Sequence, residues 1–306
     1  MRLKADLVLL LVAVLWGSAF AAQRAAGLLG SVHFFNAARF LVAAVLLLPF
    51  AARSKITRPL VLWTCAAGAI LFAASALQQA GLRTTTAGNA GFLTSLYVVV
   101  VPFVVFLGWK EKPHWTAVVA VGLAALGAYL LSTAGRFGVQ AGDILELGGA
   151  LLWALHVVLL GKFASRFDAM LFSAGQLLFA SALSWIAAGF VEMPRLPLSP
   201  ILMASILYTA VVSLGIGYTL QIWGQKHTPP TDAAIILSLE SVFAALAGAV
   251  TLGERLVPIQ LAGCSIIVIA VLLSQARGWS RMTSPASPTQ FAGADSGSRD
   301  RGPGAN

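Results

Sequence analysis

The stretch "IILSLESVFAALAGAVTLGE", residues 235–254, is apolar at almost every position, yet it carries Glu240 near its middle. A helix needs about 20 apolar residues to cross the hydrocarbon core of a bilayer, and this stretch is long enough. The rest of the chain has the same character, because 58% of its 306 residues are hydrophobic, only 10% are charged and the mean hydropathy is +0.86. Soluble domains carry about a quarter charged residues, so this composition indicates a membrane protein.

Ten such spans occur along the chain, and the short segments between them carry glycine, proline or charge. We expect helices throughout, because an open sheet would leave backbone groups unpaired in lipid. The predicted fold class is therefore all-α, a polytopic membrane protein with ten transmembrane helices. The predicted spans are residues 6–26, 34–51, 60–80, 86–108, 115–133, 143–161, 169–190, 200–222, 232–252 and 258–275.

The basic residues predict how the chain sits in the membrane. The net charge is +9, but Lys and Arg lie in short connecting segments, which is typical of topology signals and not of a nucleic-acid-binding face. If the N-terminus is cytoplasmic, twelve of the Lys and Arg residues beside the spans lie inside and five lie outside. Both termini are therefore predicted to be cytoplasmic, in a multi-pass protein of the inner (plasma) membrane. Residues 276–306 are rich in Ser, Pro and Gly and are predicted to form a disordered cytoplasmic tail.

The sequence contains an internal repeat. Two sets of residues correspond between its halves, one at a shift of 137 and one at a shift of 143, which indicates a single loop insertion within residues 188–202. The predicted domains are two five-helix repeats, residues 6–131 and 143–274. The pairs at a shift of 137 are Asp6 with Asp143, Trp16 with Trp153 and Arg39 with Gln176, and those at 143 include Gln78 with Gln221, Asn89 with Asp232 and Glu111 with Glu254.

An odd number of helices in each repeat means that the second repeat enters the membrane upside down. Inverted repeats are a transporter architecture, in which the two halves rock around a central site. We expect spans one to four and six to nine to surround the pathway, with spans five and ten outside it. The first span would also fit a secretory signal, but its twin inside the chain makes it part of the fold.

Several motifs carry a family resemblance. They are "LWGSAF" (15–20), Arg39 in "ARFLVAAVLLLPF", the paired ends "LGWKEK" and "TLGERL", and "LSLESVFAAL" in the ninth span. Together they resemble the EamA-type family of the drug/metabolite transporter (DMT) superfamily, over residues 6–275. The resemblance implies an alternating-access carrier. Members export amino acids, related metabolites or drugs, or carry nucleotide sugars or sugar phosphates. The family usually has Leu-Glu-Pro in the ninth span, whereas Ser241 follows Glu240 here, so this chain lacks the proline that would kink the helix.

Glu240 is the first candidate substrate-binding residue. A charge at mid-membrane costs about 2.5–3.5 kcal/mol, so Glu240 must face water, find a partner or stay protonated. One interpretation is a cavity carboxylate that binds a substrate amine or a proton. The other is a packing residue held by hydrogen bonds, and since the resemblance also places a Glu here, both stay open.

Arg39 is the second deep charge, about one and a half turns into its span. Its guanidinium can bind a substrate carboxylate or phosphate through two parallel hydrogen bonds. Alternatively, the side chain reaches the membrane interface or a helix end.

The remaining candidates are polar or aromatic residues within the spans. Tryptophans and tyrosines there can stack on a substrate or simply pack, and amides can line a pathway or only bond neighbouring helices. Asn89 and Asp232 would also serve as helix caps, and His156 would serve as a proton acceptor or a hydrogen-bonded neighbour. The seven candidates in this group are Trp16, Tyr97, Gln78, Gln221, Asn89, Tyr218 and Trp153.

The predicted function is transport of a small organic solute across the cytoplasmic membrane by alternating access, first of all efflux of amino acids or related metabolites. A drug or nucleotide-sugar-type carrier is the alternative. A membrane enzyme would need a cluster of catalytic groups, and a fixed structural protein would gain nothing from two interchangeable halves. Cys65 and Cys264 lie in separate apolar runs, so neither a metal site nor a cofactor is expected. The expected partners are the substrate and the lipid bilayer, without nucleic acid. Protons as coupling ion and a monomer or homodimer stay open.

Overall fold

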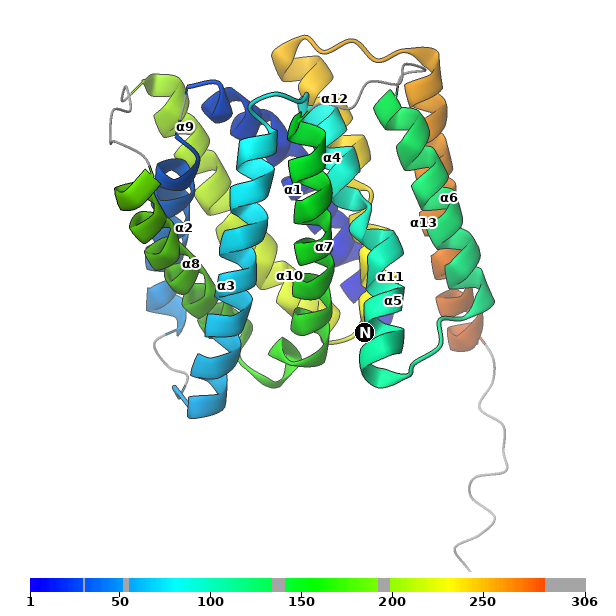
Figure 1. The fold of residues 1–306 in the computed structure, drawn as a ribbon. Coiled ribbons are helices and arrows are strands. Elements are labelled where there is room, and N and C mark those ends of the chain that lie inside the picture. Colours follow the sequence, from blue (N-terminus) through cyan, green and yellow to red (C-terminus); the bar gives the residue numbers. More distant parts are fainter. Residues whose placement is uncertain (30, 52–54, 134–140, 192–198, 284–306) are drawn as a thin grey trace, which may run out of the picture.

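The structure, a computed structural model, describes residues 1–29, 31–51, 55–133, 141–191 and 199–283 (Figure 1). Within these ranges the regular elements are all helical. The first half consists of α1 (Arg2–Gly27), α2 (Val32–Ala51), α3 (Arg58–Gly81), α4 (Ala87–Ser95), α5 (Tyr97–Trp109) and α6 (Trp115–Thr133). The second half consists of α7 (Ala141–Lys162), the 3₁₀ turn η1 (Ala164–Arg166), α8 (Ala169–Val191), α9 (Pro200–Tyr208), the π-helix η2 (Thr209–Gly217), α10 (Tyr218–Gln225), α11 (Pro230–Leu237), α12 (Glu240–Leu252) and α13 (Pro258–Thr283).

The predicted all-helical membrane fold is confirmed. Eight helical segments of the described residues are long and apolar enough to cross a membrane. The two remaining predicted spans, the fifth and the tenth, contain shorter apolar helices, Trp115–Leu131 and Pro258–Ser274. Helix α13 runs on to Thr283, so the first residues of the predicted tail are helical, whereas residues 284–306 lie outside the described residues.

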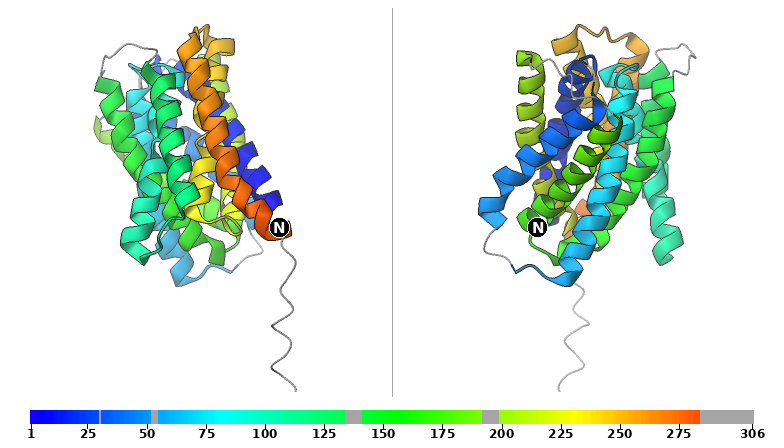
Figure 2. Two further views of the ribbon diagram at one scale, coloured as in Figure 1. Left: turned by 90° about the vertical axis from the view of Figure 1, so that its right-hand side faces the viewer. Right: turned by 60° about the vertical axis from the view of Figure 1, so that its left-hand side comes forward.

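The bundle is arranged with the fifth and tenth spans at its edge. Helices α6 and α13 pack against each other on one side, which the turned view in Figure 2 shows. Gly127 and Gly263 allow this close approach, because a Cβ at Gly127 would lie 2.6 Å from the Gly263 carbonyl oxygen. The N-terminus and the last turns of α13 lie at the same end of the bundle (Figure 1). We call this the terminal end and the other the opposite end.

The fourth and ninth spans are interrupted at corresponding positions. Helix α4 gives way to α5 at Leu96, and α11 gives way to α12 at Ser238 and Leu239, positions related by the shift of 143. At each break a serine hydroxyl bonds the carbonyl three residues earlier, Ser95 to Phe92 at 2.8 Å and Ser238 to Ile235 at 2.7 Å. A serine that bonds its own backbone in this way weakens the regular helical pattern, so the ninth span breaks beside Glu240 without the proline.

The same correspondence holds where these spans end. Lys110 after α5 and Gly253 after α12 have φ of 60° and 70°, and they are the two positive-φ positions of the described residues. A left-handed residue just after a helix is a common stop signal. Lys110 bears the strain of a side chain in this conformation, whereas Gly253 bears none.

Polar clusters join the two halves at both ends. At the opposite end, the Asn89 amide donates to Asp143 at 2.8 Å and to Thr85 at 2.7 Å. We call these three residues the opposite-end cluster. Thr86 caps α4, so the capping alternative for Asn89 is wrong.

At the terminal end, Arg2 bridges two acids. Its Nε donates to Asp6 at 3.0 Å and its Nη2 to Asp232 at 2.7 Å, while the Thr228 hydroxyl donates to Asp6 at 2.8 Å. These four residues form the terminal-end cluster. Asp6, Thr228 and Asp232 correspond by the repeat shifts to Asp143, Thr85 and Asn89. Where the first cluster has an amide, the second has a carboxylate, and Arg2 compensates the extra negative charge. Pro229 precedes α11, so Asp232 is not its cap either.

Glu254 fastens the second half to the start of α4. Its Oε1 accepts from the Ala87 backbone N–H at 2.9 Å and its Oε2 from Gly88 at 3.3 Å, which satisfies two of the unpaired donors at the start of this helix. The corresponding Glu111 instead pairs with Lys162 and is 55% exposed. The expected structural role of both, pairing or capping, is confirmed.

Glu254→Ala should therefore destabilise the protein by about 1.5–3 kcal/mol, the range for hydrogen bonds to a charged group. Glu111→Ala is the matched control and should cost less than about 1 kcal/mol, because exposed ion pairs contribute little. Thermal unfolding of the purified variants in detergent measures both. Equal shifts of the two midpoints would contradict the capping role.

Candidate functional site

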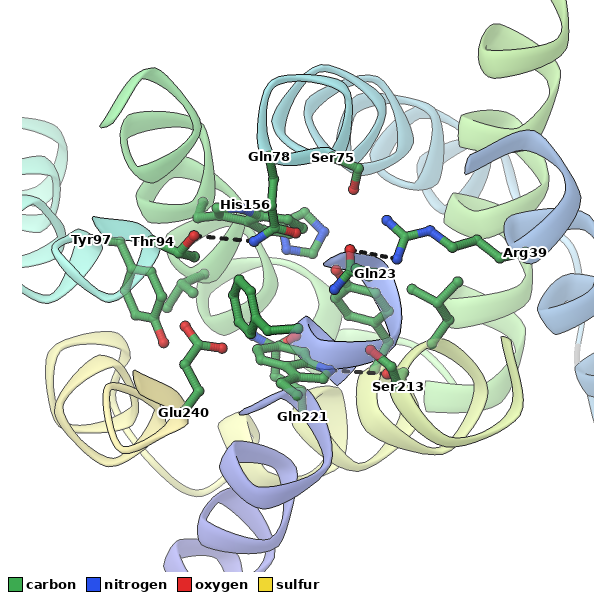
Figure 3. A pocket seen from close by; sticks show the side chains of 16 residues that line it. Gln23, Arg39, Ser75, Gln78, Thr94, Tyr97, His156, Ser213, Gln221 and Glu240 are labelled. Atoms are coloured by element: carbon green, nitrogen blue, oxygen red, sulfur yellow. Dashed lines mark hydrogen bonds between the residues drawn. The ribbon is translucent and has the colours of Figure 1, made fainter. Parts of the chain in front are cut away.

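A small cavity lies at the centre of the bundle, between helices of both halves (Figure 3). Its volume is about 40 Å³, enough for a few water molecules. The lining includes seven uncharged polar or imidazole side chains, two charged ones and a set of aromatic and aliphatic walls. The lining residues are Trp16, Phe20, Gln23, Arg39, Ser75, Gln78, Thr94, Tyr97, Trp153, His156, Val157, Ser213, Leu214, Tyr218, Gln221 and Glu240.

The structure brings together eight of the nine candidate residues. The exception is Asn89, which lies in the opposite-end cluster and does not line the cavity. Neither α6 nor α13 contributes to the lining, as expected for the fifth and tenth spans. The seventh span, α8, also contributes no lining side chain, which differs from the expectation. Helix α8 instead contacts a lining residue from behind, because its Gln176 amide oxygen lies 3.0 Å from the ring nitrogen of His156.

Arg39 lies in the cavity wall and not at the membrane interface. The residue is 2% exposed, and its Nη1 donates to the Gln23 amide oxygen at 2.7 Å. Its guanidinium also lies over the rings of Phe35 and Phe40, 5.0 and 5.2 Å from their centroids. Such contacts attract a cation without neutralising it. No carboxylate among the described residues pairs with Arg39, so a buried positive charge is left for an anionic partner.

Glu240 lies on the other side of the same cavity (Figure 3). It is the first residue of α12, directly after the break in the ninth span, and only 3% of it is exposed. Its carboxyl faces the Tyr97 hydroxyl, and Tyr97 is the first residue of α5 after the corresponding break. The two interruptions thus bring two repeat-related helix starts to the cavity. In the described part of the chain, no basic side chain forms an ion pair with Glu240.

The floor of the cavity is built on the π-helix. The Trp16 indole N–H donates to the Ser213 carbonyl oxygen at 2.9 Å, and its ring lies 5.2 Å from that of Tyr218. π-helical turns widen the backbone and are frequent at functional sites. Gly217 is needed here, because a Cβ at this position would lie 2.6 Å from the Trp16 nitrogen.

A hydrogen-bonded chain leads away from the cavity. The Gln78 amide donates to the Thr94 hydroxyl at 3.1 Å, and Thr94 donates to Glu146 Oε2, also at 3.1 Å. Glu146 is fully buried on α7 and does not line the cavity itself. The structure thus places a second buried carboxyl, besides that of Glu240, one side chain behind the cavity wall.

Sequence reasoning missed Gln23, Ser75, Thr94, Ser213 and Glu146. Helical spacing holds a signal for some of them. Gln23 follows Trp16 by seven residues and Glu146 precedes Trp153 by seven, so each lies two turns away on the same helix face as its tryptophan. Ser213 had no such signal, because it contributes a backbone carbonyl.

The described residues contain no group of three or more His, Cys, Asp or Glu side chains arranged to hold a metal ion. The two cysteines lie in different helices and are unpaired. The polar groups of the cavity are instead suited to hydrogen bonding and charge pairing with an organic solute.

Comparisons with known proteins agree with this architecture. The model of the EamA-like transporter family matches the chain twice, over residues 3–133 and 140–275. An uncharacterized transporter of Archaeoglobus fulgidus is 35% identical over 280 residues, which cover 90% of this chain and 87% of that protein. The uncharacterized transporter YvbV of Bacillus subtilis is 25% identical over 281 residues, 89% of this chain and 92% of that protein. A crystal structure of 18% identity has a similar fold, with a TM-score of 0.77 over 93% of this chain and all of that one.

The twin tryptophans provide a test of the cavity floor. Trp16→Phe removes the bond to the Ser213 carbonyl, whereas Trp153→Phe removes an indole N–H that has no partner in the described structure. Both changes shrink a ring of the same size. Trp16→Phe should therefore cost more stability, by about 0.5–1.5 kcal/mol, the net contribution of one hydrogen bond. Thermal unfolding of both variants measures the difference, and a larger loss for Trp153→Phe would contradict this geometry.

Proposed function

The chain belongs to the EamA-like transporter family, and we propose that it exports amino acids or closely related metabolites across the cytoplasmic membrane by alternating access. Family membership and the apolar helices make it a multi-pass membrane transporter of small solutes. The step from small solute to amino acid rests on one observation, the placement of Arg39 and Glu240 across one cavity.

The two charges are complementary to a zwitterion. Arg39 is buried without a carboxylate partner, and Glu240 is buried without a basic one. A solute with a carboxylate and an ammonium group would neutralise both, forming charge-assisted hydrogen bonds, which are about twice as strong as neutral ones. The rings of Trp16, Trp153 and Tyr218 would then contact its side chain.

The alternative solutes fit this cavity less well. A nucleotide sugar carries several negative charges, but the cavity has a single buried guanidinium and an opposing carboxyl. A lipophilic cation would pair with Glu240, but it would leave Arg39 without a counter-charge. Each alternative therefore satisfies one charged residue at the expense of the other.

The clusters at the two ends support alternating access. The cavity has too little room for an amino acid, and both the terminal-end and the opposite-end cluster are formed. A solute can enter only if the halves separate at one end. Because the clusters correspond by the repeat shifts, separating one while keeping the other gives the two access states of an inverted-repeat carrier.

The substrate class has a direct test. Purified protein in liposomes should take up radiolabelled L-amino acids, and unlabelled amino acids should compete. The matching amines, which lack the carboxylate, and the matching acids, which lack the amine, should compete about ten- to a hundredfold less well. Each lacks a hydrogen bond to a charged group, which contributes about 1.5–3 kcal/mol.

Variants assign each charge to its residue. Arg39→Gln should abolish the preference for amino acids over the matching amines. Glu240→Gln should abolish the preference for amino acids over the matching acids. Arg39→Lys keeps the charge and serves as the control for folding and insertion. Competition by cationic drugs alone, with no effect of Arg39→Gln, would instead support the drug-carrier alternative.

The proposed orientation has a separate test. In a background of Cys65→Ala and Cys264→Ala, single cysteines replace Arg83 and Lys112, two exposed positions at opposite ends of the bundle. A membrane-impermeant thiol reagent applied to whole cells should label the cysteine at position 83 and spare that at position 112. The reverse pattern would mean that both termini face outward.

A further inference from the structure

Glu146 has no role in the proposed solute site, yet its surroundings are unusual. It lies on α7, it is 0% exposed, and it sits behind the cavity wall. The backbone of α3 closes over it, because a Cβ at Gly81 would lie 2.8 Å from Glu146 Oε1. This carboxyl is therefore sealed from water in the conformation of the structure.

The groups around Glu146 leave its charge uncompensated. Thr94 of α4 donates to Oε2, and Gln78 of α3 reaches Glu146 only through Thr94. Oε1 is buried, and no described residue bonds to it. The charged groups that act on it are both acidic. They are Asp143 on the same helix and Glu240 from α12.

These contacts match a protonated carboxyl. A buried carboxylate without a cationic partner is strongly disfavoured, and two acidic neighbours add to the cost. A protonated carboxyl keeps the bond from Thr94 on Oε2 and carries its proton on Oε1. Glu146 can therefore hold one proton while the bundle is closed.

The position of Glu146 links that proton to both the solute and the outside of the bundle. On the cavity side, the chain through Thr94 ends at Gln78, which lines the solute site. On the other side, Asp143 lies one turn nearer the opposite end and takes part in the opposite-end cluster. When that end opens, α4 and α7 must part, and water reaches the carboxyl.

We propose that Glu146 is a proton-binding site that couples proton movement to transport. This inference rests on the proposed function. With the opposite end open and wet, the Glu146 carboxylate binds a proton from water, with Asp143 as the nearest relay. Closure of that end needs the neutral form, since it returns the group to its sealed surroundings. When the terminal end opens instead, water that enters the cavity reaches the carboxyl past Thr94 and takes up the proton, so that each cycle carries one proton from the opposite end to the terminal end and returns Glu146 to the carboxylate.

The first experiment observes the proton itself and requires no substrate. Infrared spectra of the reconstituted wild-type protein are recorded between acidic and alkaline pH and compared with those of Glu146→Gln. The difference should contain the carbonyl stretch of a protonated carboxylic acid that persists at neutral pH. Glu111→Gln, which changes an exposed carboxyl, is the control and should leave this band in place. Absence of a band assigned to Glu146 at neutral pH would overturn the proposal.

The second experiment observes coupling in liposomes, with radiolabelled L-amino acids as probes. A pH gradient should drive wild-type accumulation of label. Glu146→Gln should lose this accumulation while it keeps the exchange of labelled for unlabelled amino acid, which needs no net proton movement. Thr94→Val keeps Glu146 but breaks the chain to Gln78, and it should weaken the response to the gradient.

The outcomes separate the two proposals. Wild-type transport that ignores the pH gradient, or gradient-driven accumulation by Glu146→Gln, would overturn proton coupling and leave amino-acid transport intact. If wild-type protein moves no amino acid, the proposed function fails, and the infrared band still decides whether Glu146 holds a proton. If Glu146→Gln does not fold, the infrared titration of the wild type against Glu146→Asp, which should shift the same band, takes its place.

Discussion

The cost of a charge in a low-dielectric membrane interior governs this structure. Every deep ionisable group has to be neutral, paired or in contact with a polar cavity. Asp6 and Asp232 meet this constraint by sharing Arg2 at the end of the bundle. Arg39 and Glu240 meet it only in part, through neutral hydrogen-bonding and aromatic neighbours. The charges of Arg39 and Glu240 are therefore not neutralised within the protein. This makes the cavity a candidate binding site, because a solute of matching charge would neutralise both.

Interruptions at corresponding positions in the two halves of the chain help to place these charges. Each half contains one span that breaks at the same position, and the breaks place Tyr97 and Glu240 face to face. Uninterrupted helices would continue their side-chain pattern past this point, whereas the breaks turn new helix starts toward the centre. The end clusters follow the same correspondence, with one difference. An amide–carboxylate contact holds the opposite end, and an arginine between two carboxylates holds the terminal end. In the proposed alternating-access cycle, the two ends would therefore open against different resistance.

Much of this arrangement could be predicted from the sequence, because membrane spans and an internal repeat are strong signals. The ten spans, the outer position of α6 and α13, and the gathering of Trp16, Arg39, Tyr97 and Glu240 all followed from hydropathy and from matching the halves. The helix breaks in the fourth and ninth spans could not be predicted. A proline was the only sequence signal that we expected for such a break, and serine and leucine occupy these positions instead. The buried position of Glu146 could not be predicted either. Glu146 follows Asp143 by three residues, so the sequence suggests that both belong to a polar helix start. Only the packing of α3 and α4 buries Glu146.

Distances between spin labels would test most directly whether the two halves alternate about this cavity. One pair of labels joins Lys112 to His227 at the terminal end, and the other joins Arg83 to Leu252 at the opposite end, with each pair spanning both halves. Pulsed electron resonance is recorded on reconstituted protein before and after addition of L-amino acids. Alternating access predicts that one distance lengthens as the other shortens. Distances that stay fixed, or that lengthen together, would contradict it.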